Sequence, residues 1–190
     1  MEMLSNNAVN LKLLNCLREH GSWAGETHLQ KAAYILKKMY NVPLGNEFVL
    51  YKHGPFSFDL RDELAQLQAA GQIQVEPQPA PFGPKLGISP VGQNLLQRLE
   101  YRWEPYKDQI EQVAHWLAGY GVKKLEQLAT ALYVVSELPH EDASTWQSRL
   151  QEYKPHISDE DAQAAIAEVS AHKNVLEREE KDIPGLGQRP

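Results

Sequence analysis

Apolar residues recur at helical spacing along most of this chain, and short alternating stretches interrupt them only in its first half. The best defined helix is predicted over residues 58–70, where leucines three or four positions apart form one apolar stripe. Ser57 precedes this helix as a predicted N-cap, because its hydroxyl can accept a backbone N–H of the first turn. Gly71 is predicted to end the helix, because glycine adopts the left-handed backbone conformation without steric strain.

The residues on either side of this helix predict short strands. Residues 48–51 are apolar or aromatic and predict a strand, which Gly54 and Pro55 then break. After the helix, residues 72–76 alternate between polar and apolar and predict a second strand. A proline-rich loop follows over residues 77–84, and a returning strand is predicted at residues 86–88.

Two further helices are predicted before this stretch, over residues 7–20 and 28–40. Thr27 and Gln30 have the spacing of a capping box at the start of the second. Three helices followed by a two-stranded wing give the order of a winged helix-turn-helix. The predicted fold class is therefore mainly α with a small β wing, a winged helix-turn-helix followed by a helical extension.

The remainder of the chain is predicted to be helical. Ser89 and Pro90 begin the next helix as N-cap and first helical residue. Ser144 and Ser158 are predicted N-caps of two later helices, the first with a capping box completed by Gln147. The predicted organisation is a winged-helix domain over residues 1–100, a helical region over 101–176 and a charged, Pro/Gly-rich flexible tail over 177–190. Residues 123–173 either form a second helix-turn-helix unit or share only helix-start residues with the first.

Composition places the chain among ordinary globular proteins and indicates the cytoplasm. It has 190 residues, a net charge of −6 and one cysteine, Cys16, so no intramolecular disulfide is expected. Cys16 falls on the apolar face of the first predicted helix, which indicates a buried, inert thiol. The first ten residues lack the pattern of a secretory signal, and no apolar run approaches the ~18 residues of a membrane span.

Three segments resemble a known family: LQKAAYILKKMY, YKHGPFSFDLRDELAQLQAAGQI and LGISPVGQNLL. The Gly-Pro-Phe-Ser turn, the leucine-spaced helix ending in Gly-x-Ile and the Ser-x-x-Gly helix start resemble the YwgA-like bacterial proteins over residues 8–100. More distantly, the Gly-Pro turn resembles the Panacea (SocA-like) antitoxin domain. The first resemblance implies the fold and little about activity. The second implies binding to a protein partner such as a toxin.

No pattern in the chain indicates catalytic chemistry, and we expect no enzyme activity. The seven histidines and Cys16 do not occur in a recognised metal-ligand motif, and no nucleophile elbow or phosphate-binding loop is present. We therefore expect no catalytic residues, no metal and no cofactor. A hydrolase with an unrecognised site is the third alternative after the two binding functions below.

The leading hypothesis is a non-enzymatic cytoplasmic regulator or antitoxin-like module that binds another protein. Because nucleic-acid binding is the default use of a winged helix, the alternative is a sequence-specific DNA-binding regulator, for which a homodimer is expected. Residues 57–75 carry one basic and three acidic side chains, a net charge of −2, which disfavours phosphate contacts. The candidate interaction residues lie in the turn before the predicted helix over residues 58–70, on that helix and at the wing tip: Tyr51, His53, Gly54, Pro55, Phe56, Ser57, Arg61 and Phe82. Phe82 either is exposed as an anchor for a partner or folds back onto the protein.

Overall fold

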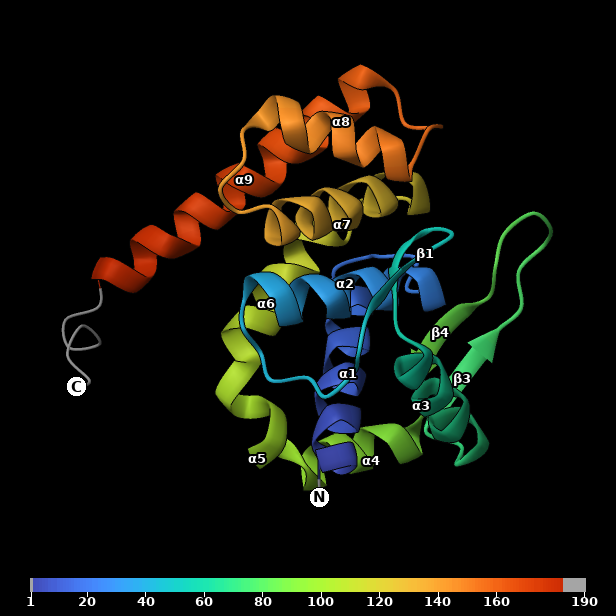
Figure 1. The fold of residues 1–190 in the computed structure, drawn as a ribbon. Helices are drawn as coiled ribbons and strands as arrows, with labels where there is room; N and C mark the ends of the chain where they lie inside the picture. The colour runs from blue at the N-terminus through green and yellow to red at the C-terminus, as the bar shows by residue number, and fades with distance from the viewer. Residues whose placement is uncertain (1, 183–190) are drawn as a thin grey trace. The chain divides into compact units, whose positions relative to one another are not determined.

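The computed structural model describes residues 2–182 and is mainly helical, with two small antiparallel sheets (Figure 1). It divides into two compact units, Met1–Glu126 and Gln127–Pro190, and helix α7 (Val122–Glu137) belongs partly to each. None of the helices within residues 2–182 combines the length and apolar character needed to cross a membrane. The prediction of a mainly α fold with a small β component is confirmed.

One helix of the first unit, the first in the chain, contacts most of the others. Helix α1 (Glu2–Glu19) packs against α2 (Glu26–Met39), α4 (Pro90–Arg98), α5 (Glu100–Trp103) and α6 (Lys107–Leu117). A short 3-10 helix, Glu104–Tyr106, joins α5 to α6 and contains Pro105. Helices α4 to α6 thus share a core with α1. For that reason the division between units falls after Glu126 and not near residue 100, where the sequence pattern places it.

The predicted ends of the helix over residues 58–70 are confirmed in α3 (Phe58–Ala69). The hydroxyl of Ser57 accepts a hydrogen bond of 3.2 Å from the N–H of Leu60, as an N-cap does. At the other end Gly71 has a φ of +69°, and the N–H of Gln72 donates to the carbonyl of Leu67 at 2.8 Å. This is a Schellman motif, which turns the chain sharply from α3 into the next strand.

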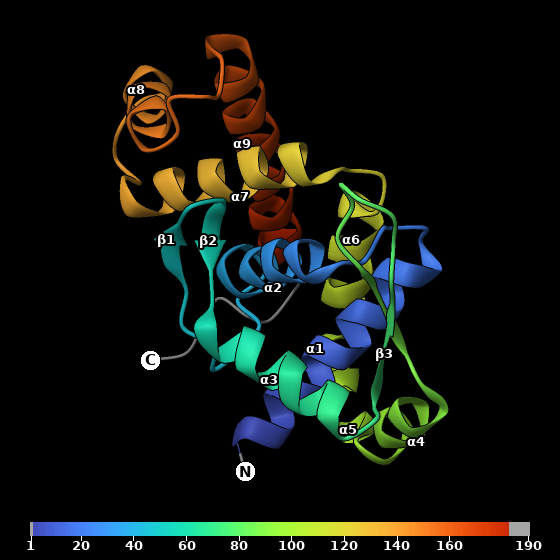
Figure 2. The same cartoon turned by 90° about the vertical axis from the view of Figure 1, so that its right-hand side faces the viewer.

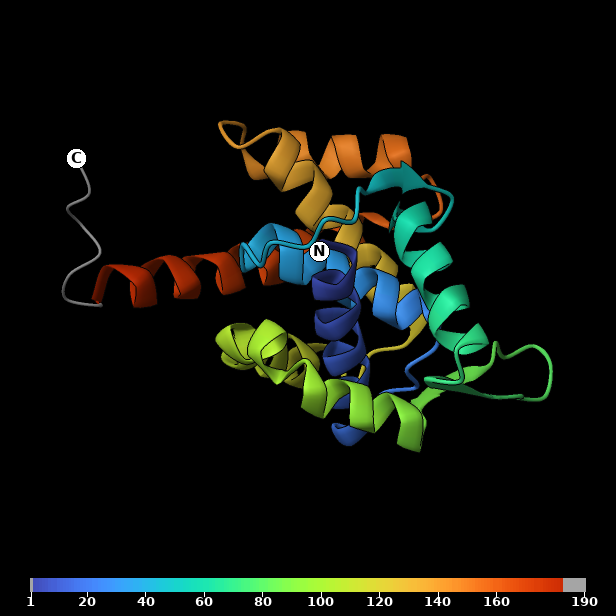
Figure 3. The same cartoon turned by 90° about the horizontal axis from the view of Figure 1, so that it is seen from below.

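The predicted wing strands are also confirmed. Strands β3 (Ile73–Glu76) and β4 (Lys85–Ile88) pair antiparallel, with Ile73 opposite Ile88, and the loop between them extends beyond α3 (Figure 3). Ser89 then caps α4, its hydroxyl accepting a 3.0 Å hydrogen bond from the N–H of Gly92. Ile73 and Leu86 are the buried side chains of the two strands.

The turn before α3 differs from the prediction. Residues 54–56 do not simply end a strand; they form a strand of their own, β2 (Gly54–Phe56), paired antiparallel with β1 (Val49–Tyr51) (Figure 2). Gly54 has a φ of +83°, which allows the tight reversal between the strands. Pro55 is tolerated because β2 has a single neighbouring strand and needs few N–H donors.

The predicted capping box of the second helix is wrong. Helix α2 begins at Glu26, with Gly25 as an N-cap that makes no side-chain hydrogen bond, so Thr27 lies inside the first turn. Gln30 bonds instead to the backbone of Ser57, as described below. A partner distant in sequence has replaced the local one, because Gln30 is buried and its amide needs both a donor and an acceptor.

The second unit contains α8 (Ala143–Tyr153) and α9 (Asp159–Asp182), which pack together. Ser158 caps α9 as predicted, accepting from the N–H of Asp161 at 3.2 Å. The cap of α8 is Asp142 and not Ser144, whose hydroxyl donates to the Asp142 carboxylate, so this capping box is also wrong.

The predicted tail overlaps the end of α9. Residues 177–182 belong to this helix, and residues 183–190 of the predicted tail lie outside the described residues. Between residues 89 and 182 no strand follows β4, so the described part of the second unit does not repeat the wing.

Candidate protein-interaction surface

Helix α2 holds the β1–β2 hairpin in place through two adjacent buried side chains. The amide of Gln30 donates to the carbonyl of Ser57 and accepts from its N–H, both at 2.9 Å. The ammonium of Lys31 donates to the carbonyl of Pro55 at 2.7 Å, and this lysine is only 1% exposed. The sequence pattern places Lys31 off the apolar face of α2, so its burial is unexpected. Together the two side chains fix the end of β2 and the start of α3.

An aromatic cluster covers the outer face of this anchored segment. The ring centroids of Tyr51, Phe56 and Phe58 lie 5.2–5.8 Å apart in tilted or edge-on arrangements. Tyr51 is 56% exposed and Phe58 is 42% exposed. The guanidinium of Arg61, one turn along α3, lies 5.1 Å from the centroid of the Phe58 ring. The cluster therefore presents aromatic surface and a positive charge to the solvent side by side.

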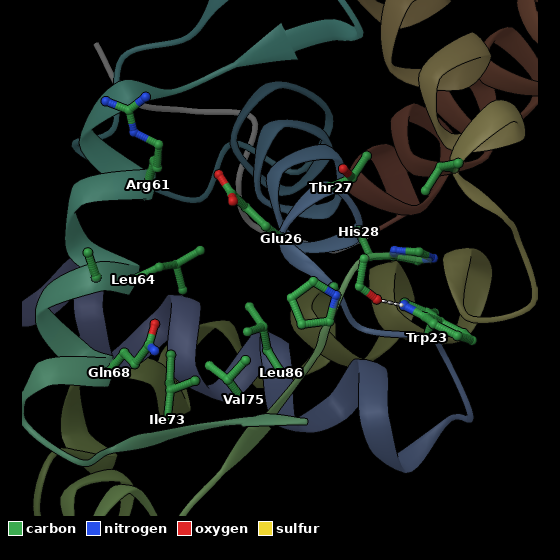
Figure 4. A pocket seen from close by; sticks show the side chains of 15 residues that line it. Trp23, Glu26, Thr27, His28, Arg61, Leu64, Gln68, Ile73, Val75 and Leu86 are labelled. Atoms are coloured by element: carbon green, nitrogen blue, oxygen red, sulfur yellow. Dashed lines mark hydrogen bonds between the residues drawn. The ribbon is translucent and has the colours of Figure 1, made fainter. Parts of the chain in front are cut away.

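A groove lies beside the cluster, between the start of α2, one face of α3 and the wing strands (Figure 4). Its volume is about 430 Å³. Apolar side chains from α3 and from both wing strands line it, namely Leu64, Ile73, Val75 and Leu86. Glu26, His28, Arg61 and Gln68 add polar groups to its lining. Arg61 lines the groove and also lies over the Phe58 ring of the aromatic cluster, so the two features adjoin at this residue.

The wing tip borders the same groove. Phe82 is 60% exposed, yet its ring also packs on Trp23 at a centroid distance of 5.2 Å. The indole N–H of Trp23 donates to the carbonyl of Gly83 at 3.2 Å, and the ammonium of Lys85 lies 4.4 Å from the Trp23 ring. Phe82 thus combines the two expected alternatives: it folds back onto Trp23 and still leaves more than half of its surface in solvent.

The structure separates the predicted interaction residues into three groups. Tyr51, Phe56 and Arg61 come together in the aromatic cluster. Gly54, Pro55 and Ser57 are buried and shape the backbone. His53 and Phe82 lie elsewhere: His53 at the hairpin turn, with Nδ1 3.7 Å from the carboxylate of Glu126, and Phe82 at the wing tip.

Two residues of this surface were not predicted, Phe58 and Trp23. Phe58 completes the aromatic cluster, and Trp23 supports the wing tip from the loop before α2. For Phe58 a signal exists in the sequence, because it begins α3 directly after the cap and follows Phe56 by two positions. Trp23 is 59 positions from Phe82, and no local pattern connects the two.

His28 gives the groove region a pH-dependent stability. Burial lowers the pKa of His28 from its ordinary value of 6.5, opposed by a hydrogen bond to the backbone of Tyr120. The unfolded chain therefore binds a proton at a pH where the folded chain does not, so stability falls as the pH drops below about 6.5. We expect the thermal midpoint to decrease between about pH 7.5 and about pH 5.5, and less so in His28→Gln. Part of the decrease should persist in the variant, because burial also lowers the pKa of His172. An equal decrease in both proteins would contradict the role of His28.

Neither models of known protein families nor curated proteins gave a match to the chain. The resemblance to YwgA-like and Panacea proteins therefore remains a prediction, and the geometry of the surface carries the functional proposal.

Proposed function

We propose that this protein is a non-enzymatic cytoplasmic interaction module, antitoxin-like in its mode of action, which binds a partner protein through the aromatic cluster and the adjoining groove. The observation that carries the proposal is the exposure of Tyr51 and Phe58 next to Arg61 at the edge of an apolar groove. Aromatic residues and arginine dominate the energetics of protein interfaces, because they bury large areas with few rotatable bonds.

The anchoring of this surface supports the proposal. Gln30 and Lys31 hold the segment from Pro55 to Ser57 with three buried hydrogen bonds of 2.7–2.9 Å. The segment is therefore ordered before a partner arrives, which reduces the entropy lost on binding. If Tyr51 and Phe58 served only the stability of the fold, burying their rings would stabilise the protein more than holding them exposed to solvent does. Their exposure therefore indicates a binding role.

We also propose that α1, α2, α3 and the β3–β4 wing form a winged helix. Their order along the chain supports it, and the β1–β2 hairpin is then an addition between the second and third helices. In such a fold the third helix and the wing are the elements that meet nucleic acid. Here the same elements border the groove, so the proposal assigns them to a protein partner.

DNA binding is the alternative, and the charges of α3 argue against it. Arg61 lies 3.4 Å from the carboxylate of Asp62, and Asp59 accepts a hydrogen bond from the N–H of Glu47 at 3.1 Å. The exposed face of α3 therefore carries one cation among acidic groups. Phosphate contacts supply most of the non-specific affinity for DNA, and this face provides few of them.

The test is quantitative capture of partner proteins from a lysate of the source cells. Tyr51→Ala should reduce capture of a specific partner at least ~10-fold, as truncation of an interface anchor does. Phe82→Ala should reduce it as well if the wing tip borders the interface. Since both side chains are mostly exposed, neither change should unfold the protein.

Tyr101→Ala is the matched control. Tyr101 is 64% exposed and has Arg102 4.9 Å from its ring, so it reproduces an exposed aromatic–arginine pair outside the groove. Equal capture by wild type, Tyr51→Ala and Tyr101→Ala would refute the proposed surface. Salt-sensitive binding of labelled duplex DNA that Arg61→Ala weakens would instead favour the DNA-binding alternative.

A further inference from the structure

Four side chains with metal-binding atoms meet where α1 packs against α6, and none of them lines the groove. Glu19, the last residue of α1, and His20 directly after it follow Cys16 by three and four positions, so all three can face Glu111 of α6. The sulfur of Cys16 and carboxylate oxygens of Glu19 and Glu111 lie within 4.8 Å of one another. Nε2 of His20 lies 3.0 Å from Oε2 of Glu111.

The distances between these atoms are close to those between the ligand atoms around a bound metal ion. Sγ of Cys16 lies 3.1 Å from Oε1 of Glu111, a distance similar to that between His20 and the same carboxylate. Ligand atoms around a tetrahedral zinc ion lie roughly 3.3–3.7 Å apart, given ordinary zinc–ligand bond lengths. Cys16, Glu19 and Glu111 already form a group of this kind, and a rotation of the His20 side chain would bring its Nε2 toward the other two ligands as well as Glu111. A thiolate, an imidazole and carboxylates together form a ligand set that zinc accepts.

The neighbours of the cluster supply charge balance and support. A thiolate and two carboxylates carry three negative charges, and a zinc ion leaves one of them uncompensated. The ammonium of Lys12, 3.7 Å from Glu111, provides the remaining positive charge. The amide of Asn15 donates to Glu19 at 2.7 Å, and the His115 ring lies edge-on to His20 with centroids 5.4 Å apart. Such outer contacts orient the ligands of metal sites.

We propose that Cys16, Glu19, His20 and Glu111 bind one zinc ion that joins α1 to α6. Cys16 is fully buried, as the sequence pattern predicts, while the other three side chains reach solvent and leave a path for the ion. Binding releases the thiol proton of Cys16 to water and replaces its hydrogen bond to Glu111 with a metal–sulfur bond. The sequence pattern predicts no metal site, because the ligands divide between two helices 91 or more positions apart and include only one cysteine.

The test is a titration of the full chain with Co²⁺ as a spectroscopic substitute for zinc, followed by competition with Zn²⁺. We expect one ion per chain and a sulfur-to-cobalt charge-transfer band that disappears in Cys16→Ser. His20→Gln and Glu111→Gln should each lower the zinc affinity at least about tenfold, since even loss of an outer contact has an effect of that size. Circular dichroism of the metal-free variants checks that each is folded.

His140→Gln is the matched control, because His140 is an exposed histidine in the loop before α8 and should leave the affinity unchanged. Failure of the wild type to show the charge-transfer band would overturn the proposal. So would a zinc affinity that is the same in wild type, His20→Gln and Glu111→Gln. If Cys16→Ser does not fold, the zinc affinities of His20→Gln and Glu111→Gln decide whether the proposal holds. Both substitutions replace side chains that reach solvent, so these proteins should fold.

Discussion

Gly92→Ala should lower the free energy of unfolding by about 3 kcal/mol, the upper part of the range for overpacking a core. A methyl group at position 92 would lie 2.2 Å from the carbonyl oxygen of Gln72 and 2.7 Å from Cγ2 of Ile88. The Gln72 carbonyl cannot easily move away, because it accepts a 3.0 Å hydrogen bond from the N–H of Ser89. The first turn of α4 would have to separate from the wing. Thermal unfolding followed by circular dichroism would measure the loss.

Gly119→Ala is the control for this substitution. A methyl group at position 119 would have no atom within 4 Å, so the free energy of unfolding should change by less than about 0.5 kcal/mol. A Gly92→Ala protein as stable as the wild type would show that α4 and the wing do not approach each other as closely as described.

Gln30→Leu should lower the free energy of unfolding by about 2–4 kcal/mol, because it leaves two buried backbone groups without a partner. The substitution keeps a similar side-chain volume but removes both hydrogen bonds to Ser57, each 2.9 Å long. Leucine can neither donate to the Ser57 carbonyl nor accept from its N–H. Urea denaturation at neutral pH would measure the difference.

The same substitution should also weaken partner binding, because Gln30 fixes the segment that carries Phe56 and Phe58. Gln66→Leu is the control, since Gln66 lies on the exposed face of α3, and its effect should stay within about 0.5 kcal/mol. A stable Gln30→Leu protein that has lost partner binding would assign Gln30 to the interface itself. A stable variant that binds normally would contradict the anchoring of the hairpin.

The candidate surface was only partly predictable from the sequence. Tyr51, Phe56 and Arg61 could be selected because they surround a recognisable turn and a capped helix. Pro55 and Ser57 belong to the same segment, but their part is to hold the backbone through hydrogen bonds to Gln30 and Lys31. The groove could not be predicted, since α2, α3 and the wing each contribute a few side chains to it.

The sequence by itself determined the local structure around α3. The cap at Ser57, the Schellman motif at Gly71 and the cap at Ser89 depend on residues within a few positions of one another, and β3 pairs with β4, the next strand in the sequence. Backbone groups at helix ends are satisfied locally, so the residue types at those positions are sufficient to predict them. The mainly helical class follows from the apolar periodicity for the same reason.

Only the tertiary structure decided the features that need partners distant in sequence. Gln30 does not form the predicted capping box, because its buried amide hydrogen-bonds to the backbone of Ser57, 27 positions away. Lys31 is buried because its ammonium donates a hydrogen bond to the carbonyl of Pro55, and Cys16 meets Glu111 only through the packing of α1 on α6. A buried polar group takes whichever partner the fold brings within reach, and its own local pattern does not reveal that partner.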